Sequence, residues 1–116
     1  MIKILIVDDD PLMRNVMEKY FTKFGCEIET SSDGINALEK VEEHRGNFDA
    51  IITDYNMHPM NGFDFYYKLK EKHPKIDVFL MTGEEKNAQI SQLIKNGLKG
   101  YFPKPLDFNQ IRETII

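Results

Sequence analysis

The sequence has very little of what cross-links a small protein. It contains a single cysteine, Cys26, so no disulfide can form within the chain, and its three histidines show no zinc-ligand spacing. A chain of 116 residues is long enough to bury a core without such supports. We therefore expect a protein of a reducing compartment, the cytoplasm, that folds around an ordinary hydrophobic core.

Long apolar runs and clusters of basic residues are also lacking. The N-terminal run, residues 4–7, ends at Asp8, far short of the roughly 20 residues that span a bilayer. Fifteen lysines and arginines against 19 aspartates and glutamates give a net charge of −4, with no basic stretch. Binding to duplex nucleic acid needs clustered basic residues. We therefore expect neither direct nucleic-acid binding nor a membrane-spanning segment.

Short apolar runs alternate five times with longer amphipathic stretches along the chain. The runs cover residues 2–7, 27–31, 49–53, 77–81 and 98–102. Nearly continuous apolar character in three of them is typical of strands that are covered on both faces. Strands that alternate with helices pair in parallel through right-handed crossovers. The pattern predicts an α/β fold, a doubly wound five-stranded parallel sheet with five helices on both faces.

The helices are expected between and after these runs, at residues 11–24, 35–42, 63–72, 87–96 and 107–116. Asp10 and Pro11 suit a helix start, and Gly25 suits a helix end. The apolar side chains that should form the buried face of the first helix are Leu12, Val16, Met17, Tyr20 and Phe21. With no linker or repeat in the sequence, we expect one domain over residues 1–116, with its last helix cut short.

Polar residues collect directly after the apolar runs. The first run is followed by Asp8, Asp9 and Asp10, the third by Asp54, the fourth by Thr82 and the fifth by Lys104. In an open α/β sheet the ligand crevice lies beyond the carboxyl ends of the strands. We therefore expect these side chains to meet at one edge of the sheet.

Asp8 and Asp9 are the candidate metal ligands. Two carboxylates at the end of a buried strand repel each other and Asp54, and they are costly there unless they are paired. Mg²⁺ accepts one or two carboxylates together with waters and a substrate phosphate. The alternative, an acid that is solvated in a loop or caps a helix, is the one we expect for Asp10.

Asp54 is the candidate nucleophile. A lone aspartate in such a loop is ordinarily a turn or cap residue, but carboxylates can also attack phosphorus while a divalent cation neutralises the developing charge. The Thr82 hydroxyl could then donate to a phosphoryl oxygen, and the Lys104 ammonium could pair with its charge. The combination points to phosphoryl transfer.

Several separated motifs together resemble the receiver (response-regulator) domains of two-component signal transduction. These motifs are Ile4-Leu5-Ile6-Val7-Asp8-Asp9-Asp10-Pro11, Asp54 with Met57, Met60 and Gly62, Met81-Thr82-Gly83, and Tyr101-Phe102-Pro103-Lys104-Pro105. The resemblance spans essentially the whole chain. It implies a flavodoxin-like sheet of strand order 2-1-3-4-5 and a cis Lys104-Pro105 peptide.

The resemblance also implies roles for individual residues. Asp54 would be the phospho-acceptor, and Asp9, Asp54 and the backbone carbonyl of Asn56 would hold Mg²⁺, with Asp8 assisting through a water. Thr82 and Lys104 would contact the phosphoryl group.

Tyr101 falls on the family's switch aromatic, whose ring moves as the threonine is drawn toward the phosphoryl group. The residues alone favour a half-buried tyrosine at a strand end.

The function implied by the resemblance is signalling. A sensor histidine kinase or a histidine phosphotransfer protein would donate the phosphoryl group from a phosphohistidine. The face made of the fourth helix, fifth strand and fifth helix would then shift its population of conformers. The chain would not be an enzyme with a separate substrate, although it would phosphorylate and dephosphorylate itself with Mg²⁺. The output partner and the oligomeric state stay open.

Two departures from the family's pattern stand out. Many DNA-binding relatives carry two acidic residues used in dimer contacts where Lys99 and Gly100 stand here, so we do not expect that form of dimerisation. His58 is inserted before Pro59, where the family commonly has Met-Pro. We expect an exposed imidazole, with an effect on phosphate lifetime or metal approach as the alternative. We also expect His44 and His73 to be solvated and without partners.

Two rival functions use the same fold or the same residues. The first is a receiver-fold interaction module that is not phosphorylated, which would leave five matching site positions unused. The second is a haloacid-dehalogenase-type phosphatase, whose Asp-x-Asp motif Asp8 and Asp10 could supply. That motif requires Thr or Val where Leu12 stands, and the phosphatase would leave Asp54 without a role.

Overall fold

The computed structural model describes all 116 residues. Its single sheet has five strands in the order β2-β1-β3-β4-β5, and every neighbouring pair is parallel. The strands are β1 (Lys3–Val7), β2 (Glu27–Ser31), β3 (Ala50–Asp54), β4 (Asp77–Thr82) and β5 (Gly100–Pro103). The predicted fold class and strand order are both confirmed.

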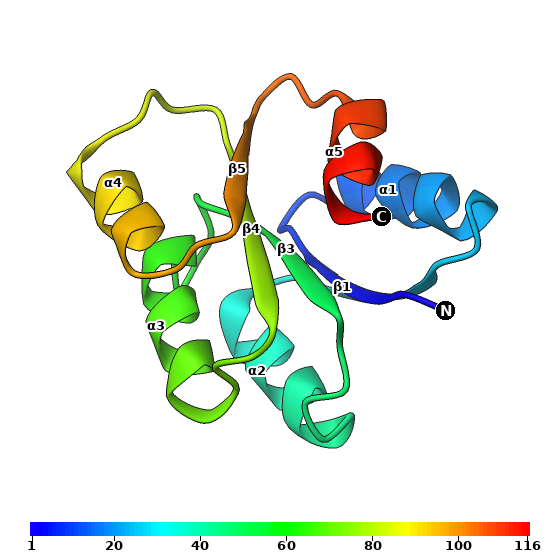
Figure 1. Ribbon diagram of the computed structural model, residues 1–116, viewed down its shortest axis with the longest axis horizontal. Coiled ribbons are helices and arrows are strands. Elements are labelled where there is room, and N and C mark those ends of the chain that lie inside the picture. Colours follow the sequence, from blue (N-terminus) through cyan, green and yellow to red (C-terminus); the bar gives the residue numbers. More distant parts are fainter.

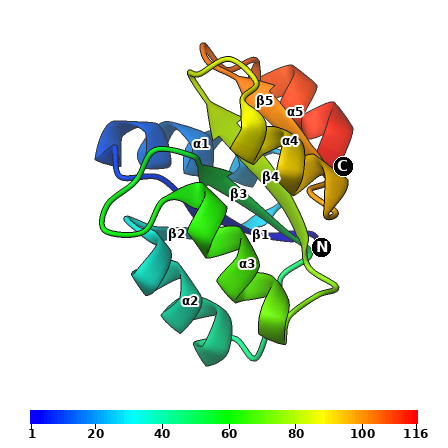
Figure 2. The same cartoon turned by 90° about the vertical axis from the view of Figure 1, so that its left-hand side faces the viewer.

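Helices cover both faces of the sheet. They are α1 (Pro11–Lys23), α2 (Gly34–Glu43), α3 (Gly62–Lys72), α4 (Ala88–Lys95) and α5 (Phe108–Ile115). Figure 1 shows α1 and α5 on one side of the sheet and α2, α3 and α4 on the other, and the turned view in Figure 2 shows α2, α3 and α4 side by side. None of these helices has the length and apolar character needed to cross a membrane.

The central strands contribute side chains to two hydrophobic cores, one on each face of the sheet. Leu5 and Val7 belong to a cluster of 17 buried residues under α2, α3 and α4. Ile4 and Ile6 belong to a cluster of 11 buried residues under α1 and α5. Successive side chains of a strand point to opposite faces, so both sets of residues must be apolar. This double burial explains the unbroken apolar runs in the sequence.

An aspartate or asparagine caps the start of every helix. The side chains that accept a hydrogen bond from a first-turn backbone N–H are Asp10, Asp33, Asn61, Asn87 and Asp107. Such caps fix the residue at which each helix begins. Four of them, those of α1, α3, α4 and α5, thereby set the loops that follow strands β1, β3, β4 and β5.

The predicted buried face of α1 was wrong in part. Met17 and Phe21 are fully buried, but Leu12 is 69% exposed and Val16 is 40% exposed. A helix turns by about 100° per residue, so Val16 lies about 100° and Leu12 about 140° around the helix from Met17. The stripe that contacts the sheet is narrower than the apolar pattern suggested.

The two histidines that we expected to be solvated both have partners, so that prediction was also wrong. Lys3 Nζ donates to His44 Nδ1 at 2.7 Å, and His73 Nε2 lies 2.9 Å from Glu42 Oε1. Each histidine ends a helix, α2 and α3 respectively. The turn back toward the sheet brings these helix ends next to charged residues that are distant in the sequence.

Candidate functional site

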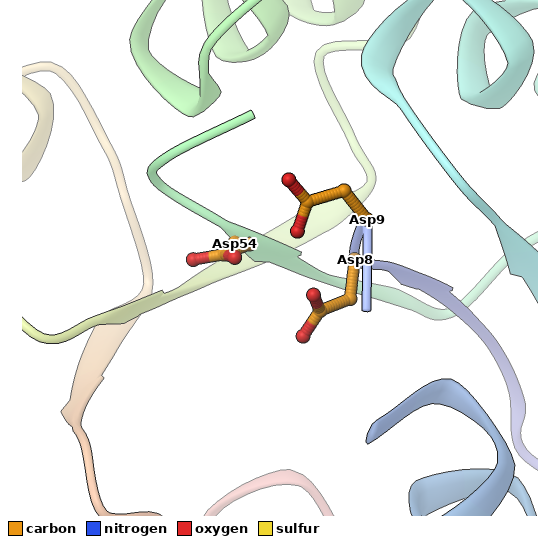
Figure 3. A group of neighbouring side chains, drawn as sticks. All are labelled: Asp8, Asp9 and Asp54. Atoms are coloured by element: carbon orange, nitrogen blue, oxygen red, sulfur yellow. The ribbon is translucent and has the colours of Figure 1, made fainter. Parts of the chain in front are cut away.

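Three carboxylates meet where β1 and β3 end. Asp54 is the last residue of β3, and Asp8 and Asp9 directly follow β1. One oxygen from each of the three lies within 4.8 Å of the others. Figure 3 shows the three side chains gathered at this edge of the sheet. Asp8 and Asp54 are buried, whereas Asp9 is exposed.

Asp8 has a buried carboxylate that is only partly hydrogen-bonded. Its Oδ1 accepts a hydrogen bond from the backbone N–H of Asp10 at 2.9 Å, but its buried Oδ2 has no partner. Burial raises the pKa of Asp8 to about 6, and the negative charge of Asp54 adds to the increase. A buried acceptor without a donor is costly. A hard cation would satisfy this oxygen, so the donor set fits Mg²⁺.

Asp54 has one cationic neighbour. Lys104 Nζ donates to Asp54 Oδ1 at 3.2 Å. Burial raises the pKa of Asp54, and the charge and hydrogen bond of Lys104 oppose that increase. The side chain of Asp54 is only 5% exposed, while that of Lys104 is 34% exposed. The lysine can therefore reach a group that arrives from solvent while it stays close to the carboxylate.

Thr82 lies at the end of β4, beside the strand that leads to Lys104. The residue is 1% exposed, and its Oγ1 accepts a hydrogen bond from the backbone N–H of Glu84 at 3.0 Å. The backbone N–H of Lys104 donates to the carbonyl of Thr82 at 2.8 Å. The ends of β4 and β5 thus hold the backbones of Thr82 and Lys104 next to each other.

The loop after β3 carries Asn56 and His58. With Asp9, Met57 and Asn61, these residues line a hollow of about 350 Å³. Asn56 is exposed, and its side-chain amide lies 3.4 Å from a carboxylate oxygen of Glu84. His58 is exposed as expected, and it lines the same hollow as Asp9, one of the candidate metal ligands.

Two cis peptides flank the site. Lys104-Pro105 is cis as the resemblance implied, and His58-Pro59, which we did not foresee, is cis as well.

Gly62 allows α3 to begin against the backbone of the acceptor strand. A Cβ at this position would lie 2.6 Å from the carbonyl oxygen of Asp54 and 2.9 Å from Cα of Tyr55. Contacts that short with backbone atoms cannot be relieved by a rotamer change. Gly62 also donates its N–H to the carbonyl of Tyr55 at 2.8 Å. A glycine is therefore required for the close approach that holds the end of β3.

Tyr101 is half-buried on β5 and packs against the larger core cluster. Together with Thr82 and Lys104, it borders a hollow of about 610 Å³ beside the loop of residues 83–86. The structure therefore brings the switch candidate next to the threonine that the resemblance pairs it with.

Sequence reasoning missed Tyr55, which directly follows Asp54. Its side chain is 7% exposed, and its hydroxyl donates to Gln89 Oε1 on α4. The sequence offered one signal, a large aromatic residue in a loop of turn-forming residues. Such a residue can be buried next to the site, as Tyr55 is.

Comparison with known proteins agrees with this arrangement. A family model described as the response regulator receiver domain matches residues 4–116. The chemotaxis protein CheY of Pseudomonas aeruginosa is 34% identical, with 97% of this chain and 92% of that protein covered. The transcriptional regulatory protein ZraR of Klebsiella oxytoca is 31% identical across 98% of this chain, which corresponds to 25% of ZraR.

Solved structures show the same fold. The chemotaxis response regulator CheY4 of Vibrio cholerae has a TM-score of 0.87 and 30% identity, with 98% of this chain and 95% of that chain covered. A response regulator receiver domain protein from Clostridium thermocellum has a TM-score of 0.93 and 25% identity, with 99% and 91% covered. The extent of the family match and these relatives establish that the chain belongs to the response regulator receiver domain family.

Proposed function

We propose that residues 1–116 act as one receiver module that takes a phosphoryl group onto Asp54 from a phosphohistidine. The donor would be a sensor histidine kinase or a histidine phosphotransfer protein. The observation that carries the proposal is the pairing around Asp54. Its buried carboxylate has Lys104 Nζ at 3.2 Å on one side and the carboxylates of Asp8 and Asp9 on the other.

The acidic residues would hold the metal ion that this chemistry needs. Asp9, Asp54 and the backbone carbonyl of Asn56 would bind Mg²⁺ directly, and Asp8 would assist through a water. The bound cation supplies neutralisation of negative charge on the phosphoryl oxygens. The partnerless Oδ2 of Asp8 is the feature of this structure that supports the assignment.

The residues of the chain then divide the transfer among them. A carboxylate oxygen of Asp54 attacks phosphorus and forms the P–O bond of an acyl phosphate. The P–N bond of the phosphohistidine breaks, and its electron pair stays with the leaving nitrogen. The donor is left as a neutral imidazole when the other ring nitrogen carries a proton; otherwise the leaving nitrogen takes one from solvent. Lys104 pairs with a phosphoryl oxygen and Thr82 donates its hydroxyl to another.

The output would follow from the same contacts. When Thr82 turns its hydroxyl toward the phosphoryl group, the hollow that it shares with Tyr101 changes shape, and the tyrosine ring can move into it. The face of α4, β5 and α5 would then present a different surface to the output partner. Such a domain would be a signalling module that modifies itself, and its self-dephosphorylation would end the signal.

Incubation with acetyl phosphate tests this function. We expect intact-mass measurement to show one phosphoryl adduct that requires Mg²⁺, is stable in acid, is labile in base and is absent in Asp54→Asn. The chain has no tryptophan, so mass or NMR must replace intrinsic tryptophan fluorescence. No adduct in the wild type would support an interaction module that is not phosphorylated. Sustained hydrolysis of phosphate esters that survives in Asp54→Asn would support the phosphatase.

A further inference from the structure

Tyr55 joins the loop of the phospho-acceptor candidate to the start of α4. Its hydroxyl donates to Gln89 Oε1, and Nδ2 of Asn87 lies 3.5 Å from the same hydroxyl oxygen. Asn87 caps α4 and Gln89 is in its first turn. One hydroxyl therefore contacts two residues that define where this helix begins.

The Tyr55 end of this contact is rigid. Its backbone N–H donates to the carbonyl of Met81 at 2.9 Å, and its carbonyl accepts from the N–H of Gly62 at 2.8 Å. The ring belongs to the larger hydrophobic core. Since the backbone and the ring are both fixed, the place of the hydroxyl is set by the end of β3 itself.

The α4 end has far less support. The helix runs only from Ala88 to Lys95, and its buried residues are Ile90 and Leu93. Asn87 accepts the N–H of Ile90 at 2.9 Å through its side chain. Residues 83–86, which lead into the helix, are all exposed. Apart from the buried side chain of Ile90, the contacts of the Tyr55 hydroxyl are therefore what joins the first turn of α4 to the rest of the domain.

The same exposed segment is attached to the site at its other end. Thr82 precedes it, and its buried hydroxyl accepts from the N–H of Glu84 at 3.0 Å. Residues 83–86 thus have a hydrogen bond to Thr82 at their start, and they lead to Asn87, whose side-chain amide lies near the Tyr55 hydroxyl. Thr82 and Tyr55 therefore form hydrogen-bond contacts at opposite ends of the loop of residues 83–87.

We propose that Tyr55 is a positioning residue whose hydroxyl holds α4 in its unphosphorylated place and opposes the shift that phosphorylation causes. The inference rests on the proposed function, since the shift follows from a phosphoryl group on Asp54. Tyr55→Phe keeps the buried ring and removes only the contacts of the hydroxyl with Gln89 and Asn87. The free energy cost of moving α4 then falls, and the unphosphorylated protein samples the activated arrangement more often.

The chain offers a matched control at the far end of the same helix. Tyr67 on α3 accepts a hydrogen bond from Asn96 Nδ2 at 2.8 Å, and Asn96 ends α4. Tyr67→Phe removes a tyrosine hydroxyl that contacts α4, as Tyr55→Phe does, but leaves the helix start and the site loop untouched.

Amide hydrogen exchange of the unphosphorylated proteins tests the Tyr55 contacts directly. We expect the amides of Ile90 and Ser91 to exchange about two- to tenfold faster in Tyr55→Phe, the range that the loss of one hydrogen bond produces. Gln89→Met should have a similar effect, and the double variant should add little to either. Tyr67→Phe should leave these two amides unchanged. If these two amides exchange in Tyr55→Phe at the rate of the wild type, the proposal is overturned.

Amide chemical shifts with and without acetyl phosphate and Mg²⁺ test the switching role. In unphosphorylated Tyr55→Phe, we expect the signals of residues 83–91 to move toward their positions in the phosphorylated wild type. Faster exchange without this movement would show a structural contact only, and would overturn the positioning role. If the wild type forms no adduct, the proposal falls together with the proposed function. An adduct with unchanged exchange overturns the proposal alone.

Discussion

The two edges of the sheet treat charge in opposite ways. At the amino-terminal edge the charge of Lys3 has partners: its Nζ lies 3.5 Å from Glu27 and donates to His44 Nδ1 at 2.7 Å. At the carboxyl-terminal edge Asp8, Asp9 and Asp54 converge, and the one ion pair is that of Asp54 with Lys104.

This difference separates residues that stabilise the fold from residues that serve chemistry. Surface ion pairs of the first kind contribute little individually, but they leave no buried charge uncompensated. At the carboxyl-terminal edge, burial raises the pKa of both Asp8 and Asp54, and repulsion by neighbouring carboxylates adds to the increase. A bound cation would stabilise the charged carboxylates there. Asp8, Asp9, Asp10 and Asp54 together with Lys104 account for three of the four net negative charges of the chain. The mild acidity of the sequence is mostly one local site.

Removal of the single cation from the carboxyl-terminal edge should have the largest effect. In Lys104→Met, Asp54 loses its partner and an arriving phosphoryl group loses a counter-charge. We expect the rate of phosphorylation by acetyl phosphate to fall by about 100-fold or more, as for the loss of one preorganised donor. Quenched-time mass measurements give the rate, and amide spectra check the fold. A rate within about twofold of the wild type would remove Lys104 from the site.

Removal of one acid from the same edge should weaken metal binding. Asp9→Asn takes away a proposed ligand, and we expect the affinity for Mg²⁺ or Mn²⁺ to fall by about 10- to 100-fold. Mn²⁺ titration followed by paramagnetic broadening measures this affinity. Asp10→Asn is the control, because asparagine keeps the helix cap and the residue is outside the proposed ligand set. Equal losses in the two variants would indicate a general charge effect rather than ligation.

Replacement of Asp8 by a neutral residue should stabilise the folded state at neutral pH when no metal is present. The fold raises the pKa of Asp8 from 3.8 to about 6, so the folded state favours the protonated carboxyl. The contribution of Asp8 to stability is therefore greatest below about pH 4 and is lost as the pH rises through about 6. Asp8→Asn should raise the free energy of unfolding at pH 7 by about 1–2 kcal/mol.

Urea unfolding of both proteins with EDTA, at pH 4.5 and at pH 7, measures this effect. The variant should be the more stable one at pH 7, and the difference should shrink at pH 4.5. A wild type that is more stable at both values would show that the Asp8 carboxylate already has a compensating partner.

Disruption of the amino-terminal edge should have the smallest effect. Lys3→Met removes the pairs with Glu27 and His44 but keeps an apolar stem against Phe48, over whose ring the ammonium lies. We expect a loss of about 1 kcal/mol or less in stability and an unchanged rate of phosphorylation by acetyl phosphate. An altered rate would mean that the two edges are coupled, and the comparison would fail.

Much of the fold could be predicted because buried parallel strands require apolar residues on both faces. The first four strands lie within one residue of their predicted positions. The fifth was predicted at residues 98–102 but is Gly100–Pro103. Leu98 is buried, and its N–H bonds to the carbonyl of Leu93. It therefore closes the end of α4, a role that its apolar side chain does not distinguish from a strand position.

The edge that carries the site could be predicted for a similar reason. Parallel strands bring their carboxyl ends together, so the residues after each run were expected to meet, and Asp8, Asp9 and Asp54 do. Contacts of side chains across the fold could not be predicted. Tyr55 and Gln89 are 34 positions apart, and no periodicity or turn signal links two such residues. Their contact depends on where α4 packs.

The location of the phosphoryl group within the chain tests the central claim most directly. Borohydride reduces an acyl phosphate of aspartate to homoserine, which remains in the chain and can be found by peptide sequencing in a mass spectrometer. After reaction with acetyl phosphate and Mg²⁺, we expect homoserine at position 54 and at no other aspartate. Homoserine at Asp8 or Asp9, or none at any position despite a phosphoryl adduct, would contradict it.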